Sequence, residues 1–422
     1  MARIGIRKTA LSLAVAGAFA GGVSQAHASA FALIEQSASG LGSSFAGAAA
    51  TAEDASTIFY NPAGMSLLPS GMQVSGGLAL INLSAKFSDS GSTNAPGRPL
   101  GGNGGDAGGL SAVPNVYFAM DVAPNWKAGV GLSVPFGLKT EYNADWAGRF
   151  QAIKSDISTF NLNPSASYKV NDKVSLGFGL NYQTIDAEFT SAVNLGGAAE
   201  AIADIKAKDN SGWGYNLGAM FQLAPDTRLG VSYRSSIKFH LTGTVAFSQA
   251  LAGANVSTDI KMPDSASIAL QHRLNPGWTL LADVTRTGWS KIKDLTIMND
   301  TAGTTLSSTP ENFRNTWRVG VGAVHRYDDA WSIKMGFAYD QTPVNDTDRT
   351  ARLPDNNRLW LSVGGQYKVS KDGTLDFGYA HLFIKDAPIN QNNPPATAGG
   401  GRLVGTYKGS VDILGAQFVY RF

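Results

Sequence analysis

Few side chains in this sequence are of the types that perform covalent chemistry. The chain contains no cysteine and five histidines, of which His27 falls in an N-terminal leader. A serine hydrolase needs a histidine base beside its nucleophile, and a zinc site needs ligands at regular spacing. The other histidines lie in no such motif and are interpreted as polar strand or turn residues: His240, His272, His325 and His381. We therefore expect no enzyme, no metal site and no cofactor.

Charged residues offer little more. Asp346 and Asp348 form an acidic pair that suits Ca²⁺, although a solvated turn is the simpler interpretation. Charged residues make up only 16% of the 422 residues and the formal net charge is +2, so the composition gives no case for a nucleic-acid partner.

The first 28 residues predict a secretory signal peptide. A basic start and an apolar run over 10–20 are followed by an A-x-A cleavage signal at 26–28. A membrane anchor is the alternative, but the run is shorter than the roughly 20 apolar residues that a spanning helix needs. We expect the mature chain to begin at Ser29.

From residue 71 onward the dominant sequence period is two. Apolar residues alternate with small or polar ones over 174–183, 213–222, 331–340 and 374–379, and in a strand this spacing places one set on each face. A half-buried soluble sheet alternates in the same way. Here, however, the apolar rows begin or end in Trp or Tyr, as at lipid interfaces, and the opposite rows are polar enough to face a lumen.

The connections between these strands alternate in length. Six short turns rich in Pro, Asn, Asp or Gly occur at 121–126, 170–173, 223–226, 274–277, 327–330 and 370–373. Seven longer segments lie between them, at about 84–110, 137–155, 191–210, 247–258, 298–310, 341–356 and 387–406. This pattern predicts an all-β fold, a transmembrane antiparallel β-barrel of 14 strands over residues 71–422, in the outer membrane of a Gram-negative bacterium.

The two ends of the mature chain support this interpretation. The chain ends in alternate aromatic residues and a final Phe422, the kind of terminus that the barrel-assembly machinery reads, although a chance apolar terminus is the alternative. Residues 29–70 are small, apolar and irregular, which predicts a plug folded inside the lumen. Because fourteen strands can close within one chain, we expect a monomer.

Two apolar loops are candidates for an outer binding groove. A short amphipathic helix is expected over 198–205 in the first loop, and the second loop, 247–258, carries further apolar side chains. Exposed apolar patches mark binding sites, and packing against the barrel rim is an equally good alternative. The groove candidates are Leu195, Ile202, Phe247 and Leu251.

A proline interrupts the third predicted strand. Pro135 lies in the strand-like run 128–138 and is followed closely by Gly137. Proline removes a donor from the strand ladder and is expected at edges or bulges, whereas a closed barrel has no edges. The alternative is that the strand ends at Val134. We predict a local break at 135–137, formed by Pro135, Phe136 and Gly137, as a sideways opening in the wall.

Several short motifs, taken in order, resemble the FadL-type family of outer-membrane channels for long-chain fatty acids and hydrocarbons. The resemblance covers nearly the whole mature chain. The matching segments are 31–42, 54–63 with its Asn-Pro-Ala sequence, 136–142, 146–150 and 354–364. Each segment alone is weak evidence, but their order and spacing make the resemblance specific.

The resemblance implies a barrel plugged by an N-terminal hatch and passive uptake of hydrophobic small molecules. It further implies that solute is captured on outer loops, moves to an inner pocket and leaves through the wall at a kinked third strand. The resemblance also assigns roles to hatch residues: Phe31 and Leu33 line the pocket, and Asn61, Pro62 and Ala63 form a structural pivot.

The substrate and even the transport role have alternatives. Where fatty-acid members hold a carboxylate with basic residues, this chain has Ser191 and Thr309. Neutral aromatic or aliphatic hydrocarbons are therefore an alternative to long-chain fatty acids. A structural or adhesin-type barrel, or a general diffusion porin, is the alternative of another class. The expected surroundings are outer-membrane lipid and lipopolysaccharide.

Overall fold

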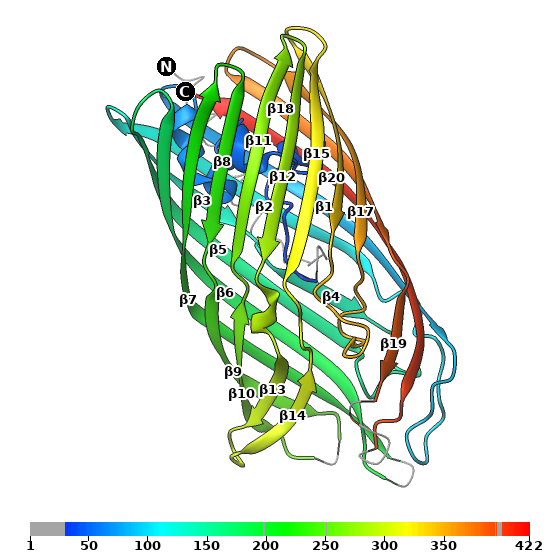
Figure 1. Ribbon diagram of the computed structural model, residues 1–422. Helices are drawn as coiled ribbons and strands as arrows, with labels where there is room; N and C mark the ends of the chain where they lie inside the picture. The colour runs from blue at the N-terminus through cyan, green and yellow to red at the C-terminus, as the bar shows by residue number, and fades with distance from the viewer. Residues whose placement is uncertain (1–29, 197–198, 250, 393, 395–398) are drawn as a thin grey trace, which may run out of the picture.

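The computed structural model describes residues 30–196, 199–249, 251–392, 394 and 399–422. They form one antiparallel barrel, closed by pairing between β1 and β20 (Figure 1). Fourteen strands span the wall, as the turn spacing predicts. The predicted signal peptide, 1–28, lies outside the described residues. None of the described helices is long and apolar enough to cross a membrane.

Eight of the fourteen spanning strands are continuous and six are split in two. The continuous strands are β1 (Met72–Asp89), β2 (Gly109–Ala123), β5 (Lys154–Lys169), β6 (Val174–Asn194), β7 (Glu200–Ala224), β16 (Trp331–Asp340), β17 (Arg358–Lys368) and β20 (Leu403–Arg421). The split strands are β3 (Trp126–Ser133) with β4 (Gly137–Glu141), β8 (Thr227–Arg234) with β9 (Ile237–Phe247), β10 (Ala254–Met262) with β11 (Ser265–Asn275), β12 (Trp278–Thr287) with β13 (Asp294–Asn299), β14 (Thr304–Pro310) with β15 (Thr316–Arg326), and β18 (Gly373–Ile384) with β19 (Ala387–Gln391).

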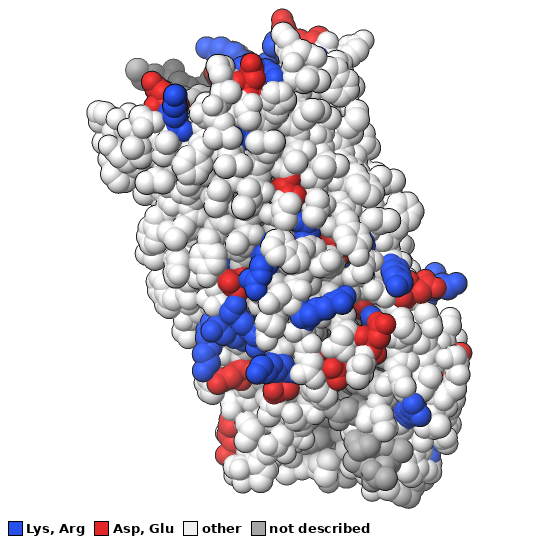
Figure 2. All heavy atoms as spheres, viewed as in Figure 1, with Lys and Arg blue, Asp and Glu red and all other residues white. Residues whose placement is uncertain are grey.

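The outer face carries an apolar belt between two rows of aromatic side chains. At the short-turn end, Trp331 packs against Tyr367 with ring centroids 4.6 Å apart. Toward the long loops, Tyr182 packs against Trp213 at 5.1 Å. Figure 2 shows few charged side chains in the zone between the charged groups at the top of the view and a band of charged groups across its lower half. A belt of this kind, roughly 25 Å tall, is what a lipid bilayer requires of a barrel.

Six of the seven long loops are shorter than the sequence predicts, and three of them are much shorter. The prediction of a helix over 198–205 is wrong, because β7 begins at Glu200. β7 pairs with β6, and Asn194 lies opposite Glu200. Alanine favours helices, but pairing with a neighbouring strand overrides that weak preference. The loops expected at 247–258 and 298–310 shrink in the same way, because β10 and β14 begin early.

Four neighbouring spanning strands break at similar positions. The breaks fall at 235–236, 263–264, 288–293 and 311–315, and the third contains the short 3-10 helix η2 (Trp289–Lys291). The outward-facing residues change from odd to even numbers across the first of these breaks. On β8 the exposed residue Val231 has an odd number, and on β9 the exposed residue Lys238 has an even number. Such interruptions shift the alternation by one residue and re-aim side chains, and the third break brings Trp289 fully into the interior.

The lumen is filled by the segment 30–70, which we call the hatch. It contains α2 (Ala38–Leu41), α3 (Ala48–Thr51), α4 (Thr57–Tyr60) and the 3-10 helix η1 (Pro62–Leu67). Asn61 caps η1, accepting the Ala63 N–H at 3.1 Å, and its amide donates to Ala219 O on β7 at 3.1 Å. The motif Asn61-Pro62-Ala63 thus ties the hatch to the wall, and its role as a pivot stays a prediction.

The wall makes room for the hatch with glycines. An added Cβ at Gly336 would lie 2.1 Å from the Ser43 carbonyl carbon, and one at Gly230 would lie 1.9 Å from Ala49 O. Further lumen-facing glycines meet hatch atoms in the same way: Gly129, Gly177, Gly218, Gly322, Gly364, Gly378 and Gly415. Because these positions lack side chains, the hatch backbone can lie directly against the barrel.

A buried ion cluster holds the hatch in place. Lys334 on β16 donates to Glu53 Oε2 at 2.5 Å and to Ser39 O at 3.0 Å, and lies 3.4 Å from Asp376. Burial would raise the pKa of the Glu53 carboxyl, but the Lys334 charge and hydrogen bond hold it below its ordinary value. Removing one member of such a buried pair typically costs about 3–5 kcal/mol.

Replacing Gly336 with valine is expected to displace the hatch, because overpacking a closed site costs about 1–3 kcal/mol or more. The ion conductance of the purified channel in planar bilayers should rise several-fold, and the hatch should become sensitive to protease. Gly76→Val is the matched control, since its added Cβ would meet nothing nearer than 3.8 Å. Equal conductance and protease resistance for both variants would contradict this packing.

Candidate ligand pocket and wall opening

The barrel wall is interrupted beside the third spanning strand. β3 ends at Ser133 and β4 begins at Gly137, so Pro135 and Phe136 lie between the two halves of this strand and Gly137 begins the second half. A sideways opening at these residues stays a prediction. In the described part of the chain, β2 pairs with β3 only from Val116 onward, and β4 pairs with β5 alone. The stretch 109–115 of β2 therefore has a strand partner on one side only, β1.

The start of the hatch occupies the inner side of this break. Ala32 forms an isolated antiparallel bridge with Phe136. The Leu33 N–H donates to Pro135 O at 2.8 Å, and the Gly137 N–H donates to Phe31 O at 2.8 Å. The break in the wall is thus closed from within by backbone bonds to the hatch.

Two side chains satisfy the remaining backbone groups of the break. The Gln36 amide donates to Val134 O at 2.7 Å, and its oxygen accepts the Val134 N–H at 3.1 Å. On the neighbouring strand, the Thr159 hydroxyl donates to Phe136 O at 2.7 Å and accepts the Phe136 N–H at 3.0 Å. Every polar group of Val134 and Phe136 is therefore paired, although neither residue belongs to a strand.

Phe31 also lines an apolar cavity of about 640 Å³. Its ring is buried, lies 4.8 Å from that of Trp289 and 6.1 Å from that of Phe136. The apolar lining comes from strands on several sides of the lumen: Leu138, Ile157, Ile185, Ala187, Phe189, Leu241, Ile260, Ile292, Leu295, Phe313 and Leu353. Phe31 thus lines an apolar cavity, and its contact with a ligand stays a prediction.

The same cavity has a polar end that the sequence did not indicate. Glu311 lines it from the break between β14 and β15, on the long-loop side of the exposed Trp317, and Arg352 lines it from the loop between β16 and β17. Arg352 Nη1 donates to Lys154 O and Ser155 Oγ, both at 3.1 Å. Neither Ser191 nor Thr309, the positions aligned with head-group residues, lines the cavity.

Burial changes the acidity of both groups at the polar end. It raises the pKa of the Glu311 carboxyl to about 8, against the opposing effect of the Arg352 charge. It lowers the pKa of the Arg352 guanidinium to about 10, which Glu311 opposes in turn. At neutral pH the cavity therefore contains a guanidinium cation beside a carboxyl group that is mostly protonated.

A second cavity, of about 1100 Å³, connects the break with the hatch. Leu33, Pro135 and Phe136 line one part of it, and the hatch residues Phe45 and Tyr60 line another. Leu33 therefore does not share the cavity of Phe31. The two residues predicted to line one pocket lie on two neighbouring cavities.

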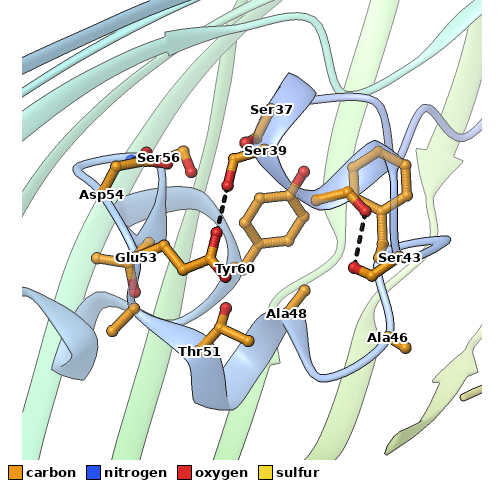
Figure 3. Close-up of a pocket in the computed structure, with 14 residues that line it drawn as sticks. Ser37, Ser39, Ser43, Ala46, Ala48, Thr51, Glu53, Asp54, Ser56 and Tyr60 are labelled. Carbon is orange, nitrogen blue, oxygen red and sulfur yellow. Dashed lines mark hydrogen bonds between the residues drawn. The ribbon is translucent and has the colours of Figure 1, made fainter. Parts of the chain in front are cut away.

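The hatch contains a smaller cavity of about 370 Å³ (Figure 3). Hydroxyl and carboxylate groups line it, among them Ser39, whose hydroxyl donates to Glu53 Oε2 at 2.5 Å. Such a lining suits water rather than an apolar solute. The apolar cavities above are therefore the better candidates for ligand binding.

The four outer-groove candidates are not brought into one groove. Ile202 packs against a cluster that includes Phe150 and Ile153. Phe247 packs against a different cluster, which includes Val245 and Val256. Leu251 is 44% exposed and Leu195 is half-buried. Capture of a ligand at these residues stays a prediction.

The histidines take the polar roles that the sequence indicates. His240 and His381 each pair with an aspartate at 2.8 Å, Asp259 and Asp412 respectively. Among the described residues, no group of three His, Cys, Asp or Glu is placed to hold a metal ion.

An apolar belt, a plugged lumen and internal apolar cavities together define an outer-membrane channel. Residues 19–422 match the family model described as outer membrane protein transport protein (OMPP1/FadL/TodX), and the chain belongs to this family of transport proteins.

Relatives and solved structures agree with this assignment. The long-chain fatty acid transport protein of Escherichia coli K12 is 28% identical over 98% of each chain. The crystal structure of a Pseudomonas aeruginosa FadL homologue is 26% identical and superposes with a TM-score of 0.86, over 93% of this chain and all of that one. The Pseudomonas putida toluene transporter TodX, at 16% identity and a TM-score of 0.68 over 94% of this chain and all of that one, shares the fold.

Gln36→Ala is expected to loosen the wall break, because it leaves both backbone groups of Val134 without a partner. An unsatisfied buried group costs about 1–3 kcal/mol, so amide exchange at Val134 should accelerate by roughly tenfold or more. Gln73→Ala is the control, since the buried Gln73 amide has no hydrogen-bond partner in the described structure. Unchanged exchange at Val134 in Gln36→Ala would show that the hatch does not secure the break.

Proposed function

We propose that this protein admits hydrophobic molecules by passive diffusion, from the Phe31 cavity to the wall break and from there into the membrane. The observation that carries the proposal is the double position of Phe31. Its ring lines the apolar cavity, while its carbonyl accepts the Gly137 N–H at the break. A ligand that moves this residue also withdraws a bond that closes the wall.

The lateral exit has a physical reason. A hydrophobic solute gains about 25 cal/mol per Å² when it leaves water for an apolar surface. An exit into the aqueous periplasm would cost the solute that free energy again, because the solute would re-enter water. An exit between β2 and β4 leads into lipid. The free edge of β2 and the hatch contacts of Leu33 support this route.

The polar end of the cavity favours an amphiphile with a carboxylate head, such as a long-chain fatty acid. The Arg352 guanidinium suits a carboxylate through paired charge-assisted hydrogen bonds, and the neutral Glu311 can donate one more. A pure hydrocarbon would leave these groups without a partner. The fatty-acid transport function of the Escherichia coli relative supports this choice, and hydrocarbon uptake, as in the toluene transporter with the same fold, is the alternative.

Restoring the strand at the break should slow uptake. Pro135→Val with Gly137→Val supplies the missing donor and two residues that favour strands. We expect the uptake rate of labelled oleate, in cells that lack the native gene, to fall at least severalfold. Pro164→Val is the control, because Pro164 lies within β5 opposite Val130, away from the break. An unaffected rate would remove the lateral exit, and equal uptake with and without the gene would favour a structural barrel.

Arg352→Met should separate fatty acids from hydrocarbons. Loss of a charged hydrogen-bond donor costs about 1.5–3 kcal/mol, so oleate affinity should fall roughly 10- to 100-fold, with toluene uptake unchanged. Arg314→Met is the control, since Arg314 bonds to Thr342 O and does not line the cavity. If oleate binding survives Arg352→Met, the cavity does not recognise a carboxylate.

The pH dependence follows from Glu311. Its pKa is raised to about 8, so the group is neutral below that value and ionises as pH rises through it. The new negative charge would repel a bound carboxylate, and oleate affinity should therefore fall between about pH 7 and pH 9. Glu311→Gln should abolish this pH dependence, and an identical pH profile in both proteins would exclude Glu311 from the head-group site.

A further inference from the structure

Three lysines form a row across neighbouring strands on the outer face of the barrel. Lys86 on β1 and Lys408 on β20 are direct cross-strand partners. The pairing of β18 with β20 ends at Phe383, opposite Ser410. Lys385 comes two residues after Phe383, so continuing this register places it beside Lys408. The row therefore crosses three adjacent spanning strands at one level of the wall.

The row borders a hollow in the wall. Lys385 and Lys408 both line a cavity of about 400 Å³, located where β18 has ended and β19 has not yet begun. The Lys86 side chain is 67% exposed, and the other two lysines are exposed as well. Two of the ammonium groups thus belong to residues that line this hollow, and the third belongs to Lys86, the cross-strand partner of Lys408.

The row lies just beyond the aromatic end of the apolar belt. Tyr379 is exposed on the outer face, and its hydroxyl donates to Asp412 at 2.7 Å. Lys408 lies on the same strand as Asp412, β20, four residues nearer the long loops. At about 3.4 Å per residue along a tilted strand, the lysines lie roughly 10 Å beyond the belt, at the depth of the lipid head groups of the outer leaflet.

Acidic neighbours offset only part of this charge. Lys86 lies 3.9 Å from Asp106, which also accepts hydrogen bonds from the Ala85 N–H and the Ser84 hydroxyl. Within the described residues, neither Lys385 nor Lys408 forms an ion pair with a carboxylate. Like charges directly opposite each other destabilise a strand pair, so an anion bound between them would relieve that repulsion.

We propose that Lys86, Lys385 and Lys408 bind the phosphate groups of lipopolysaccharide, the phosphorylated glycolipid of the outer leaflet. Lysine is a common phosphate ligand, and its stem can lie along the apolar wall while the ammonium reaches the head group. Phe383, 50% exposed beside the row, offers an apolar contact for an acyl chain. This site is independent of what the channel transports.

Binding of lipid A to the purified full-length protein in detergent tests the proposal. Lipid A that carries both phosphates should bind wild type more tightly than lipid A from which they have been removed. Lys385→Glu with Lys408→Glu should weaken binding of the phosphorylated form by about tenfold or more, whereas Lys385→Arg with Lys408→Arg should retain it. The matched control is Lys368→Glu with Lys371→Glu, two exposed lysines at the short-turn end.

Three results would overturn the assignment. The first is wild-type affinity of the charge-reversed protein for phosphorylated lipid A. The second is equal binding of dephosphorylated and phosphorylated lipid A. The third is competition by phosphatidylglycerol that equals competition by lipid A. Should the reversed variant fail to form a barrel, loss of binding in Lys385→Gln with Lys408→Gln supports the proposal. Wild-type binding by that milder variant contradicts it.

Discussion

Hydrogen bonding of the backbone inside a lipid bilayer is the constraint on which this structure depends. Lipid offers no partner for an exposed N–H or C=O, so a barrel wall must pair every such group. Where Pro135 interrupts the third spanning strand, the partners of its backbone groups come from the hatch and from side chains. Gln36 and Thr159 complete that set. The plug is therefore part of the wall as well as an obstruction of the lumen.

This arrangement couples the interior to the wall. The Phe31 carbonyl accepts a hydrogen bond from Gly137, and the Phe31 ring packs against Trp289. Gly137 and Trp289 belong to different sides of the barrel. Trp289 reaches the interior because four spanning strands break at similar positions. The hatch itself is held tightly elsewhere, by wall glycines and by Lys334. The start of the hatch, 31–36, is thus the part whose contacts join the cavity to the wall break.

The sequence by itself determined the architecture. Alternation and turn residues are local signals, so the fourteen strands, the aromatic belt and the plug were predictable from them. The missing N–H of Pro135 is also a local property, and it located the break. The sequence failed over 198–205, where alanines suggested a helix although Glu200 begins a strand. Helix preference is weak, and pairing with β6 decides the outcome. That pairing depends on a neighbouring strand and cannot be predicted from residues 198–205 alone.

Only the tertiary structure decided the composition of the sites. Arg352 lies in a loop and Glu311 in a strand break, and neither segment has a periodic pattern. They meet beside Phe31 because the barrel closes distant strands around one lumen. The same register placed Leu33 on a separate cavity and kept Ser191 away from both. Lys86 and Lys408 are more than 300 residues apart in sequence, yet they face each other because the first strand pairs with the last. Side chains from distant strands become neighbours through strand register, which depends on the whole closed sheet.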